Sequence, residues 1–72
     1  MRDLVYNIVV YYLTTRDVLY IQRLITNSNI SCMVEDEGDW LMVHLTTFDI
    51  NDSQYILNIM EKYGSRVQDL TS

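Results

Sequence analysis

The fold is decided by the stretch ISCMVEDEGDWLMVHLTTF, residues 30–48. Two runs rich in strand-forming residues, 30–35 and 39–48, are separated only by a short segment that contains Glu37 and Gly38. Such runs, joined by a turn that contains glycine, are typical of a β-hairpin. We therefore predict two adjacent antiparallel strands in the middle of the chain.

The pairing within this hairpin decides which side chains share a face of the sheet. A loop of two residues pairs Cys32 with Val43 on an apolar face and turns His44 to the other face. A loop of three residues, 36–38, is the alternative, and it shifts the pairing by one residue. We favour the two-residue loop because it keeps His44 off the core.

Before the hairpin, the sequence predicts a strand followed by a helix. Residues 4–13 are rich in Val, Ile and Tyr. Because both faces of this strand are apolar, we expect it to lie in the centre of the sheet. Thr14 and Asp17 are spaced as in a capping box, and apolar residues at helical spacing follow them. The helix is expected to end near residues 27–29, where asparagine favours helix termination.

After the hairpin, the pattern of helix and strand repeats. Residues 49–54 are dense in capping and acidic side chains, which are typical of a helix N-terminus, and Gly64 is well placed to end that helix. Residues 66–70 predict a short edge strand, and the alternative is a disordered tail. The element order is then βαββαβ in a single domain, residues 1–72. We therefore predict an α+β, ferredoxin-like sandwich, in which a four-stranded antiparallel sheet has strands one and three in its centre and both helices on one face.

The composition favours some classes of function and compartment over others. A net charge of −5 with only five basic residues disfavours binding to the phosphate backbone of nucleic acids. Cys32 is the only cysteine, which favours a reducing compartment and an inert, buried thiol. The apolar run of residues 8–13 is too short to span a bilayer and lacks a secretory cleavage site, so we expect a cytoplasmic protein without a membrane partner. The absence of Ala and Pro is typical of AT-rich coding sequences, as in many phages and low-GC bacteria, and a phage origin would place the protein in a host cytoplasm.

The acidic stretch around Gly38 and the single histidine are the candidates for chemistry. An EF-hand needs oxygen ligands at alternating positions and a Glu at the twelfth, but the twelfth residue counted from Asp36 is Thr47. We therefore interpret these carboxylates as a solvated turn. His44 has no thiol beside it, since the favoured register turns Cys32 to the opposite face. We expect no enzymatic activity, no metal and no cofactor.

The second strand of the hairpin is apolar on both faces, although two helices can cover only one face of the sheet. An uncovered apolar patch on a small domain is typical of an interface, and Trp, Tyr and Met are common in such patches. We predict a non-enzymatic protein-binding protein, either a homodimeric adaptor or a stoichiometric inhibitor, with a host-directed or anti-defence role if it comes from a phage. The residues expected to contact the partner are Tyr11, Met33, Glu35, Asp36, Glu37, Asp39, Trp40, Met42 and His44.

Two other uses of this layout lead to different functions. A small-molecule-sensing domain of ACT-like layout shares the element order and would hold a ligand at a subunit interface near Thr14, Thr15 and Arg16, and this is our alternative function. The glycine-containing turn that such domains use there is absent. An RNA-recognition fold stacks bases on aromatic residues of the two central strands. Its basic, glycine-rich motif is absent from DWLMVHL, residues 39–45, and acidic residues flank Trp40.

Overall fold

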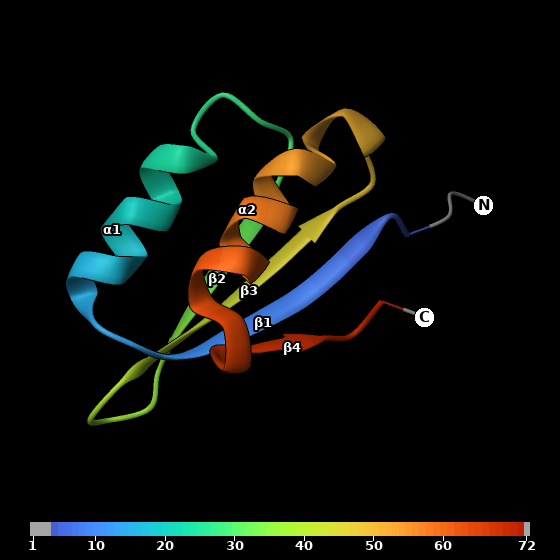
Figure 1. Ribbon diagram of the computed structural model, residues 1–72. Helices are drawn as coiled ribbons and strands as arrows, with labels where there is room; N and C mark the ends of the chain where they lie inside the picture. The colour runs from blue at the N-terminus through green and yellow to red at the C-terminus, as the bar shows by residue number, and fades with distance from the viewer. Residues whose placement is uncertain (1–3, 72) are drawn as a thin grey trace.

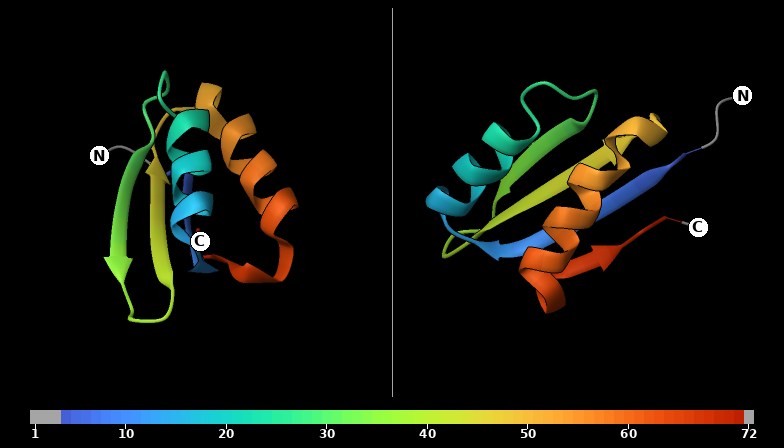
Figure 2. Two further views of the ribbon diagram at one scale, coloured as in Figure 1. Left: turned by 90° about the vertical axis from the view of Figure 1, so that its left-hand side faces the viewer. Right: turned by 45° about the horizontal axis from the view of Figure 1, so that its top comes forward.

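The computed structural model describes residues 4–71. The chain folds as an α+β protein in which a four-stranded antiparallel sheet, with the strand order β2-β3-β1-β4, carries two helices (Figure 1). Both helices lie on one face of the sheet, which we call the covered face, and the opposite face is the open face (Figure 2). In chain order the elements are β1 (Tyr6–Leu13), α1 (Thr15–Leu24), β2 (Ser31–Asp36), β3 (Leu41–Thr47), the 3₁₀ turn η1 (Ile50–Asp52), α2 (Ser53–Tyr63), the 3₁₀ turn η2 (Gly64–Arg66) and β4 (Val67–Asp69).

Two predictions about the sheet are confirmed. The strands β1 and β3 occupy its centre, and the C-terminal tail forms the edge strand β4, which pairs antiparallel with β1. The central place of β1 explains why it is apolar on both faces, since Ile8 and Val10 are fully buried and Val9 between them is 5% exposed.

The hydrophobic core lies between the covered face and the two helices. Each helix buries one stripe of side chains at helical spacing, and each central strand buries alternate residues, as amphipathic elements do. The buried apolar residues of this core are Ile8, Val10, Leu13, Val18, Ile21, Ile25, Val43, Leu45, Ile56, Ile59 and Tyr63.

Local hydrogen bonds explain where the helices begin and end. The predicted capping box is present: the Asp17 N–H donates to Thr14 Oγ1 at 3.3 Å, and the Thr14 N–H donates to Asp17 Oδ2 at 3.1 Å. The bond from the Thr14 backbone lowers the pKa of the Asp17 carboxyl. Gly64 ends α2 with a φ of 50°, a conformation that costs glycine little.

The register of the hairpin differs from the predicted one. Cys32 pairs with Leu45 rather than with Val43, so the predicted pairing is wrong by two residues. A shift of two residues preserves the alternation of side chains. Cys32 therefore lies on the covered face and His44 on the open face, as the sequence predicted, although their neighbours across the hairpin are different.

The cause of the shifted register is a longer loop. The last strand pair joins Asp36 to Leu41, so the loop comprises residues 37–40. The Glu37 N–H donates to the Trp40 carbonyl at 2.9 Å, and the Gly38 N–H donates to Asp36 Oδ1 at 2.9 Å. The aspartate side chain therefore organises the turn locally, a role that aspartate often takes before glycine.

Candidate protein-binding face

The open face is built from alternate residues of neighbouring strands. Met33 of β2 pairs with His44 of β3, and Glu35 pairs with Met42. On its other side, His44 pairs with Val9 of β1. Four of these side chains were predicted contact residues, and the register brings them onto one surface without a helix above them (Figure 2).

Exposure on the open face depends on the position of each strand. Val9 lies on the central strand between β3 and β4 and is 5% exposed. Met33 lies on the edge strand β2 and is 60% exposed. The largest apolar exposure on this face is therefore displaced from the centre of the sheet toward its edge and its end.

A β-bulge in β1 turns an additional tyrosine to the surface. Between the strand pairs made by Val10 and Leu13, two residues of β1, Tyr11 and Tyr12, lie opposite one residue of β3. Tyr12 has a φ of 63°, in the left-handed region that a tyrosine rarely adopts. The extra residue returns Leu13 to the covered face, where it is buried, and leaves Tyr12 59% exposed.

The bulge and the hairpin loop meet in an aromatic cluster, which we define as Tyr11, Tyr12 and Trp40. The ring centroids of Tyr12 and Trp40 are 4.6 Å apart, and Tyr11 lies perpendicular to Tyr12 at 5.4 Å. The Tyr11 and Trp40 rings are separated by 6.5 Å. These distances are within the range of favourable aromatic pairs, and Tyr11 makes an edge-to-face contact with each of the other two rings.

His44 has one close polar neighbour on this face. Its Nε2 atom lies 3.6 Å from Glu35 Oε1, too far for a hydrogen bond, and has no hydrogen-bond partner among the described residues. The thiol of the hairpin, Cys32, faces the opposite side of the sheet, and burial raises the pKa of that thiol. Within residues 4–71, no three His, Cys, Asp or Glu side chains are grouped closely enough to hold a metal ion.

The predicted carboxylates fall into two groups. Glu35 lies on the open face, whereas Asp36, Glu37 and Asp39 lie at the exposed end of the hairpin, which we call the hairpin tip. The sequence prediction missed Tyr12, because alternation along a regular strand directs it to the core side. The one sign of the bulge in the sequence was the pair of adjacent tyrosines before Leu13. Leu13 is apolar, and one extra residue in the strand turns its side chain back to the covered face.

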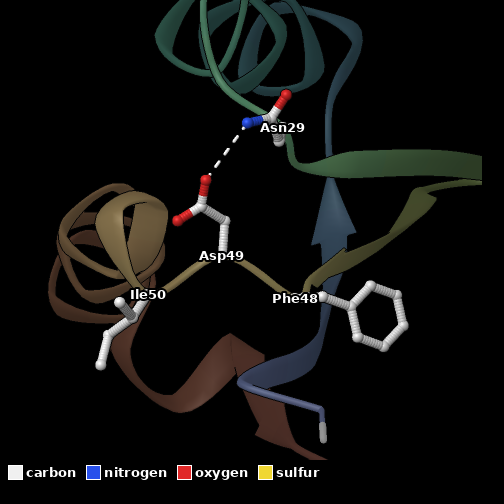
Figure 3. A pocket seen from close by; sticks show the side chains of 4 residues that line it. All are labelled: Asn29, Phe48, Asp49 and Ile50. Carbon is white, nitrogen blue, oxygen red and sulfur yellow. Dashed lines mark hydrogen bonds between the residues drawn. The ribbon is translucent and has the colours of Figure 1, made fainter. Parts of the chain in front are cut away.

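A separate, shallow depression lies at the start of α2 (Figure 3). Asn29 Nδ2 donates to Asp49 Oδ2 at 3.2 Å, and the Asn29 N–H donates to Asp52 Oδ2 at 2.9 Å. These bonds tie the loop after α1 to the start of α2. Phe48 and Ile50 line the depression but point away from each other in Figure 3, so they do not converge on a ligand.

Neither the helices nor the comparisons with known proteins point to a class of function. Neither helix in residues 4–71 reaches the length and apolar character needed to cross a bilayer. No family model, curated protein or solved structure matches the chain. Its function must therefore be inferred from its own surface.

Proposed function

We propose that the chain is a small, non-enzymatic protein-binding protein that acts through its open face. The contact surface is the sheet-face patch, which we define as Tyr11, Tyr12, Met33, Trp40 and Met42. A partner would remove these side chains from water, and burial of apolar area is the main driving force of such association.

The conformation of Tyr12 is the observation that carries this proposal. A left-handed backbone costs a residue with a Cβ atom about 1–2 kcal/mol. Such strain is retained where the surrounding structure enforces it, and it is concentrated at functional sites. Here the strained residue directs a large aromatic ring outward, 59% exposed. The cost of the left-handed backbone is therefore not offset by burial of that ring in the core.

The chemistry of the patch suits a protein partner. Tyrosine and tryptophan are frequent anchors of binding energy, and methionine adapts its shape to the opposing surface. Glu35 on the same face and the carboxylates of the hairpin tip favour a partner with a basic surface, because opposite charges raise the rate of encounter.

We further propose a fold class, a compartment and a role. The sheet read as β4-β1-β3-β2, with a helix crossing between β1 and β2 and another between β3 and β4, supports a ferredoxin-like sandwich. A single thiol supports a cytoplasmic location. The lack of Ala and Pro supports a phage origin, and with it a host-directed role as an inhibitor or adaptor.

Affinity capture with matched variants tests the proposal. Proteins retained by the wild-type chain are compared with those retained by Met33→Asp, which places a charge inside the patch. Ile50→Asp is the control, since Ile50 is also an exposed apolar residue, at 72%, but lies in the 3₁₀ turn η1 before α2. We expect the specific partner to bind wild type and Ile50→Asp alike and to bind Met33→Asp at least about tenfold more weakly. Equal retention by all three chains would refute the role of the patch.

The alternative function as a ligand-sensing domain has one observation in its favour. A depression of about 340 Å³ lies at the N-terminus of α1 and is lined by Thr14, Thr15 and the hairpin tip. A small molecule with hydroxyl or ammonium groups would suit these oxygen-rich walls. Thermal unfolding in the presence of individual amino acids and nucleosides tests it: one compound should raise the Tm of the wild type but not of Thr15→Val. If no compound acts in this way, the alternative fails.

A further inference from the structure

The exposed side of α1 carries a stripe that combines positive charge with apolar surface. Arg16, Leu19, Tyr20 and Arg23 follow one another at helical spacing and line a shallow hollow. Leu19 is 51% exposed and Tyr20 41%, so this side of the helix takes no part in the core.

The second helix extends this stripe. Lys62 of α2 places its Nζ atom 4.0 Å from the centre of the Tyr20 ring, which is a cation–π contact. Three of the five basic residues in a chain of net charge −5 therefore lie together. We call Arg16, Leu19, Tyr20, Arg23 and Lys62 the basic stripe.

The cations of the stripe form no ion pair within the described chain. Between residues 4 and 71, no Arg or Lys lies within 4.0 Å of a carboxylate, because the single ion pair found there joins His44 to Glu35. Asp17, the acid next to Arg16 in sequence, is engaged elsewhere. Its oxygens accept hydrogen bonds from Thr14 and from the Tyr63 hydroxyl. The stripe is thus open to carboxylates from outside.

The same molecule presents matching carboxylates at the hairpin tip. Asp36, Glu37 and Asp39 are exposed there, and the hairpin projects beyond the end of the sheet (Figure 1). Glu37 and Asp39 make no side-chain hydrogen bond or ion pair among the described residues. The hairpin tip therefore presents three exposed carboxylates, and the basic stripe presents three cations of opposite charge.

The tip and the stripe are adjacent on the surface. The depression at the start of α1 is lined on one side by Thr14 and Thr15 and on the other by Asp36 and Asp39 of the hairpin tip. Arg16, the first cation of the stripe, follows Thr15 directly. Two complementary patches that adjoin in this way form a surface that can pair with itself around a two-fold axis.

We propose that a second copy of this chain occupies the basic stripe. The hairpin tip of each copy lies against the stripe of the other, and the two-fold axis passes near Thr14 and Thr15. Each of the two equivalent contacts then pairs three carboxylates with three cations, around an apolar centre formed by Leu19 and Tyr20. This dimer leaves Met33 and Met42 of the open face uncovered, whereas Trp40 of the sheet-face patch and the hairpin tip lie beside the two-fold axis.

Such a dimer should be weak and sensitive to salt. Exposed ion pairs contribute little individually, and ions at about 0.15 M screen them beyond about 8 Å. Its use would be to present two sheet-face patches at once, so that a partner with two equivalent sites is bound with higher avidity.

Sedimentation equilibrium at several protein and salt concentrations tests the dimer. We expect a monomer–dimer equilibrium whose Kd rises with salt. Glu37→Lys should raise the Kd at least about tenfold at low salt, because a like charge then meets the stripe. Asp69→Lys is the matched control: it changes the net charge by the same amount on β4, at the opposite edge of the sheet, and should leave the Kd within about twofold.

Mixing two reversed chains gives the sharper test. Arg16→Glu/Arg23→Glu and Glu37→Lys/Asp39→Lys should each be monomeric alone, since both contacts become repulsive. An equimolar mixture should dimerise, because every tip again faces an opposite charge. If a reversed chain fails to fold, Arg16→Gln/Arg23→Gln and Glu37→Gln/Asp39→Gln replace it, and each should weaken the dimer.

Three results would overturn the inference. They are a wild-type monomer under all conditions, a dimer that Glu37→Lys does not weaken, and a mixture of the reversed chains that stays monomeric. If the second result is found and Met33→Asp does weaken the dimer, the open face remains a binding surface. Loss of partner capture by Met33→Asp with an unchanged dimer would support both proposals separately.

Discussion

The covered face and the open face are formed by alternate residues of the same strands, yet the exposure of their side chains is determined by different features. On the covered face, most alternate apolar residues of β1 and β3 are buried, as Leu45 shows at 0% exposure, and Tyr6 and Leu41 at the strand ends are partly buried. On the open face, exposure runs from 5% at Val9 to 60% at Met33, and Tyr12 is displayed by a bulge. Periodicity therefore locates the core, whereas strand position and local backbone geometry determine the binding surface.

Removing packing from the covered face should have the largest effect. Ile21→Ala leaves a cavity between α1 and the sheet and should cost about 2–5 kcal/mol of unfolding free energy. Met33→Ala on the open face is the control, and a surface truncation of this kind should change stability by less than about 0.5 kcal/mol. Urea denaturation followed by circular dichroism measures both. Similar losses from the two substitutions would contradict the division between the faces.

The bulge can be examined by comparing glycine with alanine at two adjacent tyrosines. At Tyr12, Gly should be more stable than Ala by about 1 kcal/mol, because only Gly adopts the left-handed backbone without strain. At Tyr11 the order should reverse, with Ala more stable by about 0.5–1 kcal/mol, as expected inside a strand. The four variants are ranked by their free energies of unfolding in urea. The same order at both positions would show that Tyr12 is not strained.

The start of α1, which borders the hairpin tip, should show a smaller effect. Thr14→Ala removes one half of the capping box and should cost about 1 kcal/mol. Thr26→Ala is a suitable control, since Thr26 lies beyond the end of α1 and its hydroxyl donates only to the Gln22 carbonyl. Thermal unfolding of the two variants should lower the Tm only for Thr14→Ala, and equal shifts would remove the box as the cause.

The same capping box makes the smallest prediction, a dependence on pH. The folded state lowers the pKa of Asp17 below its ordinary value of 3.8, chiefly through the Thr14 N–H, so it binds the proton less tightly than the unfolded chain does. Its contribution to stability is therefore complete well above pH 3.8 and is lost as the pH falls through the lowered pKa. Asp17→Asn should reduce the loss of stability between pH 4 and pH 2. An unchanged acid limb would exclude this role.

Much of the architecture could be predicted from local signals. The order of the elements follows from periodicity and from the Thr14–Asp17 spacing, and the central position of β1 follows from its two apolar faces. The face of each residue paired in the hairpin was also correct, since an error of two residues preserves parity. Cys32 and His44 were placed on opposite faces for that reason.

The rest depends on geometry that a pattern of side chains does not record. The hairpin loop has four residues instead of the predicted two, so the first strand pair is Asp36–Leu41, and the Gly38 N–H donates to Asp36 within this turn. The bulge inserts one residue and breaks the alternation at Tyr12, so the most exposed aromatic of the open face escaped prediction. The adjacency of the hairpin tip to Arg16 follows only from the folded sheet.

The central claim is that a partner protein contacts the open face, and methionine methyl NMR tests it most directly. Met33 and Met42 lie on that face, whereas Met60 packs against the core from α2. With methyl-labelled methionine and the captured partner, we predict that the Met33 and Met42 signals shift or broaden while the Met60 signal stays unchanged. A shifted Met60 signal with unchanged Met33 and Met42 signals would contradict the account.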